Sequence, residues 1–435
     1  MTAQDFIATR RDGREHTDAE IRSFVEMATS GSMPDYQVAA WLMAAYLNPL
    51  TPQETAWLTL AMAESGERLD LGSLPKPWVD KHSTGGVGDK VTLVALPLLA
   101  SCGVTAVKMS GRGLGITGGT IDKLESVPGF RVDLSPEEMV EQASRIGIAL
   151  TGQTPALAPA DKKLYALRDA TGTVSNIPLI VSSILSKKLA GGAETVVLDV
   201  KSGSGGFMRT LTQARELAQS LKSVALLAGL NVRLVISDMD QPLGRACGNA
   251  LEVQEAVEIL SSGDPAGRVA RLSIELVALT LQASGRIPDL DEAREFAVGQ
   301  LQSGAAKQKA QQWFQAQGAP ADFFDRPADY LAAAPVQIDL IAQMTGTVER
   351  VDAERVGRCV VALGGGRERK EDQIDPSVGV EVFSEVGAGV ERGASLARIH
   401  AKDSDSARTA LFELTEAFMI SEEEVIAQPL IQDIL

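Results

Sequence analysis

The sequence predicts an α/β fold joined to an all-α domain: a helical domain, a mostly parallel α/β domain with a cleft between the two, and a smaller C-terminal α+β domain. Three observations support this. At 435 residues the chain exceeds what one hydrophobic core usually organises. Its first 65 residues show helical patterns only, whereas strands, glycine loops and helices alternate from about residue 75. Short alternating strands with glycine turns follow near the end.

Composition narrows the function. The net charge is −16, which disfavours nonspecific binding to nucleic acid or an anionic membrane, although a small phosphate pocket stays possible. The three cysteines are Cys102, Cys247 and Cys359, outside any CxxC pattern, which favours a reducing cytoplasm over secretion. We expect neither a signal peptide nor a membrane span, because no apolar stretch is long enough.

Capping patterns begin the predicted N-terminal helices. Thr17 with Glu20 forms one capping box, and Thr51 with Glu54 forms a second, with proline between them at the first helical position. The stretch Asp35–Leu47 is apolar almost all round, so it should be buried in a core or against a second subunit.

Runs rich in β-branched residues follow, and each leads into a glycine-rich turn. They are "WVDKH", "VTAVKM" (104–109), "TVVLDV" (195–200) and "VRLVIS" (232–237). Helical stretches such as "VTLVALPLLASCG", "APADKKLYALRDATG" and "IPLIVSSILSKKLAGG" separate them, which is typical of a largely parallel sheet. Ligands of such sheets collect at the C-terminal ends of strands, where these loops lie.

After a loop-like stretch at 320–335, "TGTVERVDA", "GRCVVALGGG" and "GVEVFSEVGAGVERGASLARIHA" predict short strands, and "DSARTALFELTEAF" predicts a closing helix. The glycine hairpins are similar to those of lipoyl carriers. No modifiable lysine stands at a hairpin tip, so this region is interpreted as structural.

The first glycine loop, "DKHSTGGVGDKVT" (Asp80–Thr92), places one of only three histidines, His82, beside hydroxyls and glycines ahead of a helix. Such a loop is either an anion site at a helix N-terminus or a structural turn. The second loop, "KMSGRGLGITGGTIDKLE" (Lys108–Glu125), contains a formal GxGxxG. A dinucleotide site would need an acidic residue closing the next strand, but "RVDLSPEE" predicts a helix start instead. We therefore expect Ser110 and Thr120 to face the first loop and share one tetrahedral anion with it.

A third set consists of Arg168, Ser183 and Lys187. Ser183 and Lys187 are four residues apart and share a helix face. The pair is either a solvated polar stripe or an edge that hydrogen-bonds a heterocycle carrying carbonyl groups, with Arg168 joining from the preceding helix.

Together these blocks resemble the class II pyrimidine nucleoside phosphorylases, the thymidine phosphorylase family. The run "SGRGLGITGGTIDKLE" resembles the family signature, and "DKHSTGGVGD", "GQTPALAPADKKLYALRDATGTV" and "DVKSGSGGFM" match flanking blocks in order. The resemblance implies a helical dimerisation and base-binding domain (1–65 with 163–193), an α/β phosphate-binding domain (66–162 with 194–335) and a C-terminal domain (336–435). It also implies a homodimer, and a cleft that closes about hinges in "ERLDLGSLPKPW", "TPALAPAD" and "LAGGAE".

The resemblance implies reversible phosphorolysis of uridine, thymidine and deoxyuridine to the free base and (deoxy)ribose 1-phosphate, without an organic cofactor. It assigns phosphate to Lys81, Ser83, Thr92, Lys108, Ser110 and Thr120. It assigns the base to Arg168, Ser183 and Lys187, with apolar neighbours Leu114, Val174, Ile180 and Phe207. The residues expected to act in catalysis are His82, Arg168 and Lys187.

The chemistry agrees with this assignment. Phosphate needs positioning rather than activation, and the departing pyrimidine anion needs hydrogen-bond donors. We expect His82, with a pKa near neutrality, to donate to a ring carbonyl. Arg168 and Lys187 would stabilise the negative charge on the base.

Two positions depart from the family pattern. Relatives often carry a hydroxyl residue at position 90, beside a monovalent cation whose other ligands match Gly88, Leu243, Ala246 and Glu255. Here position 90 is lysine, and we predict that its ammonium replaces potassium near Glu255; the alternative is that it turns into solvent and the ion binds. Ile116 replaces a histidine common in relatives and removes a polar group near base or sugar.

Lys108 favours a broad pyrimidine enzyme over a thymidine-restricted one, in which this position tends to be apolar. Two further alternatives stay open. One is transfer of the anthranilate phosphoribosyltransferase type on the same fold, which would need acidic magnesium ligands near the loops. The other is a non-catalytic nucleoside- or phosphate-binding protein.

Overall fold

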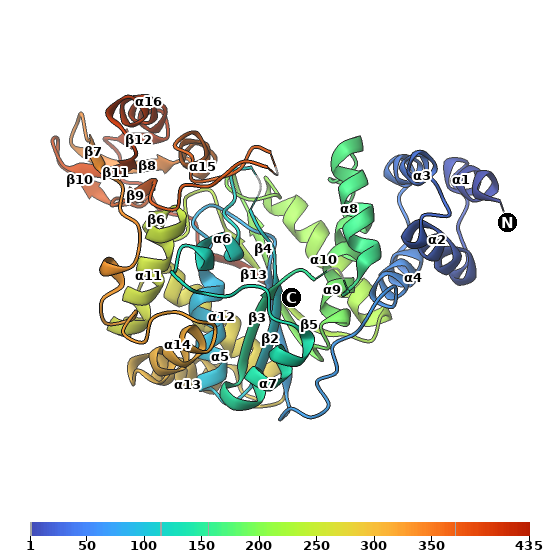
Figure 1. The fold of residues 1–435 in the computed structure, drawn as a ribbon. Helices are drawn as coiled ribbons and strands as arrows, with labels where there is room; N and C mark the ends of the chain where they lie inside the picture. Colours follow the sequence, from blue (N-terminus) through green and yellow to red (C-terminus); the bar gives the residue numbers. More distant parts are fainter. Residues whose placement is uncertain (1, 114, 155, 370) are drawn as a thin grey trace.

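A computed structural model describes residues 2–113, 115–154, 156–369 and 371–435. Figure 1 shows three parts: a helical domain at the right, a central sheet flanked by helices, and a smaller domain at the upper left. The predicted fold class is confirmed. No helix among the described residues is long and apolar enough to cross a membrane.

The helical domain combines the N-terminal helices with a later pair. Its helices are α1 (Ala3–Arg11), α2 (Asp18–Ser30), α3 (Asp35–Leu47), α4 (Pro52–Ala63), α8 (Pro159–Thr171) and α9 (Ile177–Ala190). Both predicted capping boxes are present, at Thr17 and Thr51. Helix α8 packs on α2 and α3, and α9 packs on α4. The domain boundaries predicted at 65, 163, 193 and 335 stay a prediction.

The central sheet has six strands in the order β13-β5-β4-β1-β2-β3. The strands are β1 (Trp78–Ser83), β2 (Thr105–Ser110), β3 (Ile148–Gly152), β4 (Thr195–Ser202), β5 (Asn231–Asp238) and β13 (Ile431–Ile434). All neighbours are parallel except β13, which runs antiparallel to β5. The carboxyl ends of β1 and β2 therefore lie side by side, and the two glycine loops leave the sheet together.

Helices cover both faces of this sheet. They are α5 (Val91–Ser101), α6 (Thr120–Glu125), α7 (Pro136–Ile146), α10 (Leu211–Leu227), α11 (Asn249–Ser262), α12 (Arg268–Ala283), α13 (Leu290–Gln302) and α14 (Ala305–Ala316). Helix α5 is almost wholly buried in the largest apolar cluster, which explains its uninterrupted apolar sequence. Helix α10 packs with α4 and α9 around a second apolar cluster. The helical and α/β domains therefore share apolar contacts.

The C-terminal domain contains short antiparallel strands and two helices. They are β6 (Ala246–Cys247), contributed from the α/β part, β7 (Val336–Ile341), β8 (Gly346–Val351), α15 (Ala353–Ala362), β9 (Gly379–Val382), β10 (Gly389–Val390), β11 (Ser395–Ala401), α16 (Ser404–Thr415) and β12 (Phe418–Ser421). The predicted closing helix is present as α16.

The strand expected in "GRCVVALGGG" is wrong, because this stretch falls largely within α15. Asp352 accepts a hydrogen bond from the Arg355 N–H and begins the helix. Ala353, Val356 and Val360 then place a buried face at helical spacing. The β-branched pair Val360–Val361 suggested a strand, but the cap and this spacing decide the structure.

The three predicted crossings between the helical and α/β domains lie beside one another. The Glu67 N–H donates to the Ala156 carbonyl at 2.9 Å, and the Leu69 N–H donates to the Ala190 carbonyl at 2.8 Å. A Cβ at Gly192, where φ is +79°, would lie 2.7 Å from the Leu69 carbonyl oxygen, so this crossing requires glycine. Three stretches of chain thus form one joint between the two domains.

Candidate active site

The first glycine loop leaves β1 at Ser83 and is fixed by its own side chains. The Ser83 hydroxyl donates to Asp89 Oδ2 at 2.5 Å, and the Gly85 N–H donates to Ser83 Oγ at 3.1 Å. Asp89 Oδ1 accepts the Val91 N–H at 3.2 Å and so begins α5. Thr84 is tied to β4, since its Oγ1 accepts the Lys201 N–H at 2.9 Å. The loop therefore has one defined shape, with glycine N–H groups beside the strand end.

Several buried lysines form ion pairs with aspartates close to this loop. Lys188 Nζ lies 2.7 Å from Asp80 Oδ2, and Lys108 Nζ lies 3.4 Å from Asp80 Oδ1 and also donates to the Lys81 carbonyl. Lys201 Nζ lies 2.6 Å from Asp199 Oδ2 and 4.0 Å from Asp89 Oδ2. Around these three aspartates lie four lysines, Lys81 included, so lysines outnumber carboxylates beside the first glycine loop.

Lys81 is the unpaired member of this set. Its side chain is buried, with 1 % of the residue exposed, and its Nζ has no hydrogen-bond partner among the described residues. Burial lowers the pKa of Lys81, and nearby Asp89 and Asp199 oppose that shift. A buried ammonium without an acceptor is costly, and an anion bound beside it would remove that cost.

The second loop leaves β2 at Ser110, which is buried, and returns at Thr120, the first residue of α6. The Gly113 N–H donates to Asp122 Oδ2 at 2.6 Å and closes the loop on α6. The Arg367 guanidinium, from the C-terminal domain, donates to Asp122 Oδ1 at 2.7 Å. The strand pairing of β1 with β2 therefore places Ser110 and the first loop at one edge of the sheet.

His82 is the fifth residue of β1, between Lys81 and Ser83, and pairs with Leu198 of β4. Burial lowers its pKa well below 6.5, and the charges of Lys188, Lys108, Lys187 and Lys81 lower it further. The expectation of a pKa near neutrality is wrong, because the imidazole is buried and lysines from β1, β2 and α9 add positive charge near it. His82 is neutral at pH 7, and a neutral imidazole can still donate one N–H.

The base-side residues gather on α8 and α9. Lys187 Nζ donates to Ser183 Oγ at 3.0 Å and pairs with Asp161 Oδ2. Arg168 is buried and donates to the Leu179 carbonyl at 2.9 Å and the Val174 carbonyl at 2.6 Å. The Ser183–Lys187 pair is thus mostly buried rather than a solvated stripe.

Two atoms in this group lack partners among the described residues. They are Asp161 Oδ1 and Arg168 Nε, both buried. Burial lowers the pKa of Arg168, and Asp161 opposes the shift, so the two charges lie near each other. The charge of Lys187 on this side, like those of Lys81 and Lys108 on the anion side, lowers the pKa of His82.

The remaining predicted residues have the following positions. Thr92 is buried in the first turn of α5, and Val174 and Ile180 are partly buried beside Arg168 and α10. Phe207 is 44 % exposed and follows Gly206, which pairs with Gly86 of the first loop. Leu114 lies outside the described residues. Contacts between Phe207 and the base-side residues are not among the described interactions.

Lys90 does not point into solvent. Its Nζ donates to the Leu243 carbonyl at 2.8 Å, the Ala246 carbonyl at 2.9 Å and Glu255 Oε2 at 2.8 Å. Burial lowers the pKa of Lys90, but Glu255, Glu252 and Cys247 together more than offset this and the net shift is upward. All three N–H groups are used. A monovalent cation does not fit among these oxygens while the ammonium lies there.

Ile116 is partly buried and packs against the apolar core of the C-terminal domain. A Cβ at Gly357 of α15 would lie 2.9 Å from Ile116 Cβ, so the loop and helix touch closely. The second glycine loop is therefore supported from outside by the C-terminal domain.

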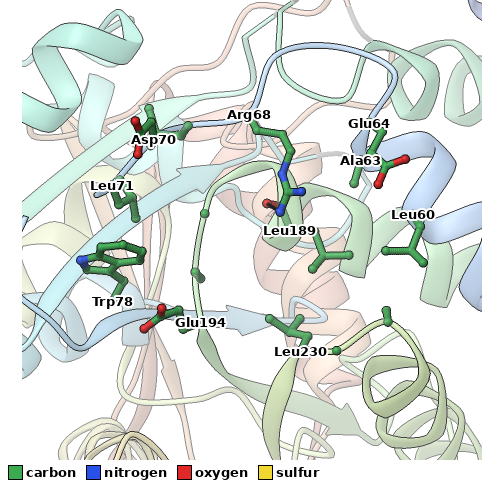
Figure 2. Close-up of a pocket in the computed structure, with 15 residues that line it drawn as sticks. Leu60, Ala63, Glu64, Arg68, Asp70, Leu71, Trp78, Leu189, Glu194 and Leu230 are labelled. Atoms are coloured by element: carbon green, nitrogen blue, oxygen red, sulfur yellow. Dashed lines mark hydrogen bonds between the residues drawn. The ribbon is translucent and has the colours of Figure 1, made fainter. Parts of the chain in front are cut away.

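A cavity of about 600 Å³ lies beside the crossing segments that join the helical and α/β domains (Figure 2). Figure 2 shows Arg68, Asp70, Trp78 and Glu194 around it, on the crossing segments and the strand starts. None of the predicted site residues lines it. The cavity is separate from the candidate active site and leaves free space beside the crossings.

The sequence analysis did not single out Asp161 or Lys188, although both lie in the candidate site. Asp161 stands in the quoted block "TPALAPAD", and its distance from Lys187 along the chain gives no signal of pairing. Lys188 adjoins Lys187, but only the fold shows that it turns to Asp80 instead.

Comparison with known proteins gives matches along most of the chain. The family described as "Glycosyl transferase family, a/b domain" matches residues 75–307. Residues 4–66 match "Glycosyl transferase family, helical bundle domain", and residues 347–421 match "Pyrimidine nucleoside phosphorylase C-terminal domain".

Among curated proteins, the pyrimidine-nucleoside phosphorylase of Bacillus subtilis (strain 168) is 46 % identical over 92 % of each chain. That of Staphylococcus haemolyticus (strain JCSC1435) is 45 % identical over 92 % of each chain. The thymidine phosphorylase of Sinorhizobium medicae (strain WSM419) is 42 % identical over 99 % of this chain and 98 % of its own. A solved anthranilate phosphoribosyltransferase from Thermus thermophilus shares the fold, with a TM-score of 0.59, 20 % identity, and coverage of 72 % of this chain and 99 % of its own.

Proposed function

This chain belongs to the family of pyrimidine-nucleoside and thymidine phosphorylases, and on that premise we propose that it catalyses reversible phosphorolysis of uridine, thymidine and deoxyuridine. The products are the free base and ribose or deoxyribose 1-phosphate. The observation that carries the proposal is the buried Lys81 ammonium, which has no hydrogen-bond partner in the described part of the chain and adjoins a neutral His82.

Phosphate binds, in this proposal, at the edge where β1 and β2 end. Lys81 supplies an ammonium whose hydrogen bonds are unused among the described residues, and Lys108 donates to the Lys81 carbonyl beside it. Ser83, Ser110, Thr92 and Thr120 supply hydroxyl donors, as the family resemblance implies. Because lysines already pair with Asp80, Asp89 and Asp199, these acids are poorly placed to hold the magnesium of a pyrophosphate substrate. This favours inorganic phosphate over a phosphoribosyltransferase substrate.

The pyrimidine binds against α8 and α9, where Lys187, Ser183 and Arg168 offer donors to its carbonyl groups. Phosphate attacks C1′ while the C1′–N1 bond breaks, and that bonding pair leaves with the base as negative charge. Lys187 and Arg168 stabilise this charge. His82 donates a neutral N–H to a ring carbonyl, which avoids placing a further positive charge among four lysines. Asp161 holds the Lys187 ammonium in position.

Substrate breadth rests on Lys108. Its ammonium lies between Asp80 and the Lys81 carbonyl at the phosphate side of the site. We propose that it favours acceptance of ribonucleosides as well as deoxyribonucleosides, as in broad pyrimidine enzymes of the family.

No organic cofactor is proposed, and the potassium of relatives is replaced by the Lys90 ammonium. Support comes from its three contacts, which use the Leu243 and Ala246 carbonyls and Glu255. A buried ammonium bonded to a carboxylate and two carbonyls supplies the same charge as a monovalent ion at the same oxygens. Activity should therefore be indifferent to potassium.

Two assembly features are also proposed. The protein is a homodimer through α3, on which Tyr36 and Leu47 are 73 % and 69 % exposed in the single chain. The helical and α/β domains close on the substrates about the three adjacent crossings, and the cavity of Figure 2 gives those segments room to move.

Three free, buried cysteines suit a reducing compartment such as the cytoplasm.

The test is a substrate panel of uridine, thymidine, deoxyuridine and cytidine, with and without inorganic phosphate, in which free base is followed by ultraviolet absorbance. We expect base release from the first three that depends on phosphate. Release from thymidine and deoxyuridine but not uridine would restrict the enzyme to deoxyribonucleosides. Absence of phosphate-dependent release from all four would refute the function.

A further inference from the structure

One buried ammonium, that of Lys123, joins the two glycine loops. Lys123 lies on α6, one turn after Thr120, and its side chain is 1 % exposed. Its Nζ donates to the Gly118 carbonyl of the second loop at 2.9 Å and to the Asp89 carbonyl of the first at 3.2 Å. It also lies 3.2 Å from Glu252 Oε2 on α11. Lys123 therefore joins three separate elements, by a hydrogen bond to each glycine loop and an ion pair to α11.

The two carbonyls that accept from Lys123 belong to residues close to the proposed phosphate ligands. Asp89 is one: its carboxylate accepts the Ser83 hydroxyl and also the first N–H of α5, the helix that carries Thr92. Gly118 stands two residues before Thr120. The ammonium consequently links the Ser83 side of the site to the Thr120 side.

The arrangement leaves little freedom at this point. A Cβ at Gly118 would lie 3.2 Å from Lys123 Nζ, so the loop passes directly over the ammonium. Glu252 is buried, with 4 % of its side chain exposed, and its other carboxylate oxygen accepts the Gly248 N–H at 3.2 Å. A neutral side chain at position 123 would leave this carboxylate buried without its cation.

We propose that Lys123 is a positioning residue that sets the separation of the two phosphate-binding loops without touching phosphate itself. This role rests on the proposed phosphate site. It differs from that of Lys90, whose contacts are with the 243–246 segment and Glu255 and do not reach the second loop.

The test compares Lys123→Met and Lys123→Ala with the unchanged protein. We expect KM for phosphate to rise roughly 10- to 100-fold, by analogy with the loss seen when a residue that orients a metal ligand is removed. KM for the nucleoside should change less than about threefold, because Lys123 contacts none of the base-side residues. In Lys123→Ala the vacated space lies between two carbonyls and a carboxylate, so added ammonium chloride should lower KM for phosphate again. Tetramethylammonium chloride, which is too large for the space, should not.

Lys309→Met is the matched control, because Lys309 Nζ also donates to a carbonyl, that of Ile146, but remote from both loops. Its KM for phosphate should match that of the unchanged protein. A second readout does not need turnover: the rise in melting temperature on adding phosphate should be reduced in the Lys123 variants and restored by ammonium in Lys123→Ala.

Three outcomes would overturn the proposal. One is a folded Lys123→Met with KM for phosphate within about twofold of the unchanged protein, well short of the change expected for a positioning residue. Another is an equal rise of both KM values, which would indicate general loosening. The third is failure of both variants to fold even with ammonium, which would make Lys123 a residue of the whole fold. If the unchanged protein releases no base, the proposed function fails; phosphate-dependent melting still tests the role of Lys123.

Discussion

If the Lys90 ammonium takes the place of potassium, as we propose, replacing Lys90 by threonine should make the protein respond to potassium. The substitution removes the ammonium but leaves the Leu243 and Ala246 carbonyls and the Glu255 carboxylate around the vacated space. The side chain of Glu255 is only 12 % exposed, so its charge would lie largely buried and unpaired. Breaking such a pair by removing one partner costs about 3–5 kcal/mol.

The size of the thermal effect follows from the length of the chain. An unfolding entropy of about 2.1 cal/mol/K per residue gives roughly 0.9 kcal/mol/K for 435 residues, so the loss corresponds to a Tm about 3–5 °C lower. Potassium that binds the vacated space should restore part of this. At a concentration about 100 times its Kd it would return about 2.7 kcal/mol, which is more than half of the loss.

The assay is differential scanning fluorimetry of the unchanged protein and Lys90→Thr in potassium chloride, with choline chloride holding the ionic strength constant. The unchanged protein should show the same Tm in both salts, and Lys90→Thr should recover only in potassium. Lys309→Thr serves as control and should respond to neither salt. A potassium-dependent Tm or activity in the unchanged protein would refute the reasoning, as would a Lys90→Thr protein with full stability in choline chloride.

Three further changes test the proposed site. Burial lowers the pKa of Lys108 to about 7, so the unchanged protein loses this ammonium above pH 7 and its KM for phosphate should rise. Lys108→Met has no ammonium to lose, so the ratio of its KM to that of the unchanged protein should fall between about pH 6 and about pH 9. A constant ratio would contradict this. His82→Gln should lower kcat about 10²- to 10³-fold with little change in KM for phosphate, and kcat of the unchanged protein should show no titration near pH 6.5, because the pKa of His82 lies well below that value. Leu47→Asp should convert the proposed dimer to a monomer in light scattering, since it places a charge on the exposed apolar face of α3; a dimer of unchanged stability would exclude this surface.

Features of the fold that depend on neighbouring residues could be predicted from the sequence. The caps at Thr17 and Thr51, the strands at 104–109, 195–200 and 232–237, and the helix after Ser135 all follow from residues within a few positions of each other. The error at 357–366 arose where a β-branched pair and a helical cap gave opposite signals. Strand β13 was not predicted, because its pairing with β5 depends on a distant part of the chain.

The charges of the site could not be worked out in the same way. The pKa of His82 depends on lysines from β1, β2 and α9, which only the fold brings together. The pairs Lys188–Asp80, Lys187–Asp161 and Lys123–Glu252 each join residues far apart in sequence. Residue types at strand ends indicated an anion site. Which lysine lacks a hydrogen-bond partner among the described residues depends on contacts between distant segments, which only the fold brings together.

The antiparallel strand β13 has a consequence for synthesis on the ribosome. Ile431–Ile434 covers the outer edge of β5, and the Asp238 N–H donates to the Leu430 carbonyl at 2.9 Å. Since these residues follow the entire C-terminal domain, a nascent chain that has completed β5 carries an open sheet edge until that domain has emerged. Such an edge can pair with other chains. During translation, the β5 edge is therefore open to wrong pairing from the completion of β5 until β13 has emerged.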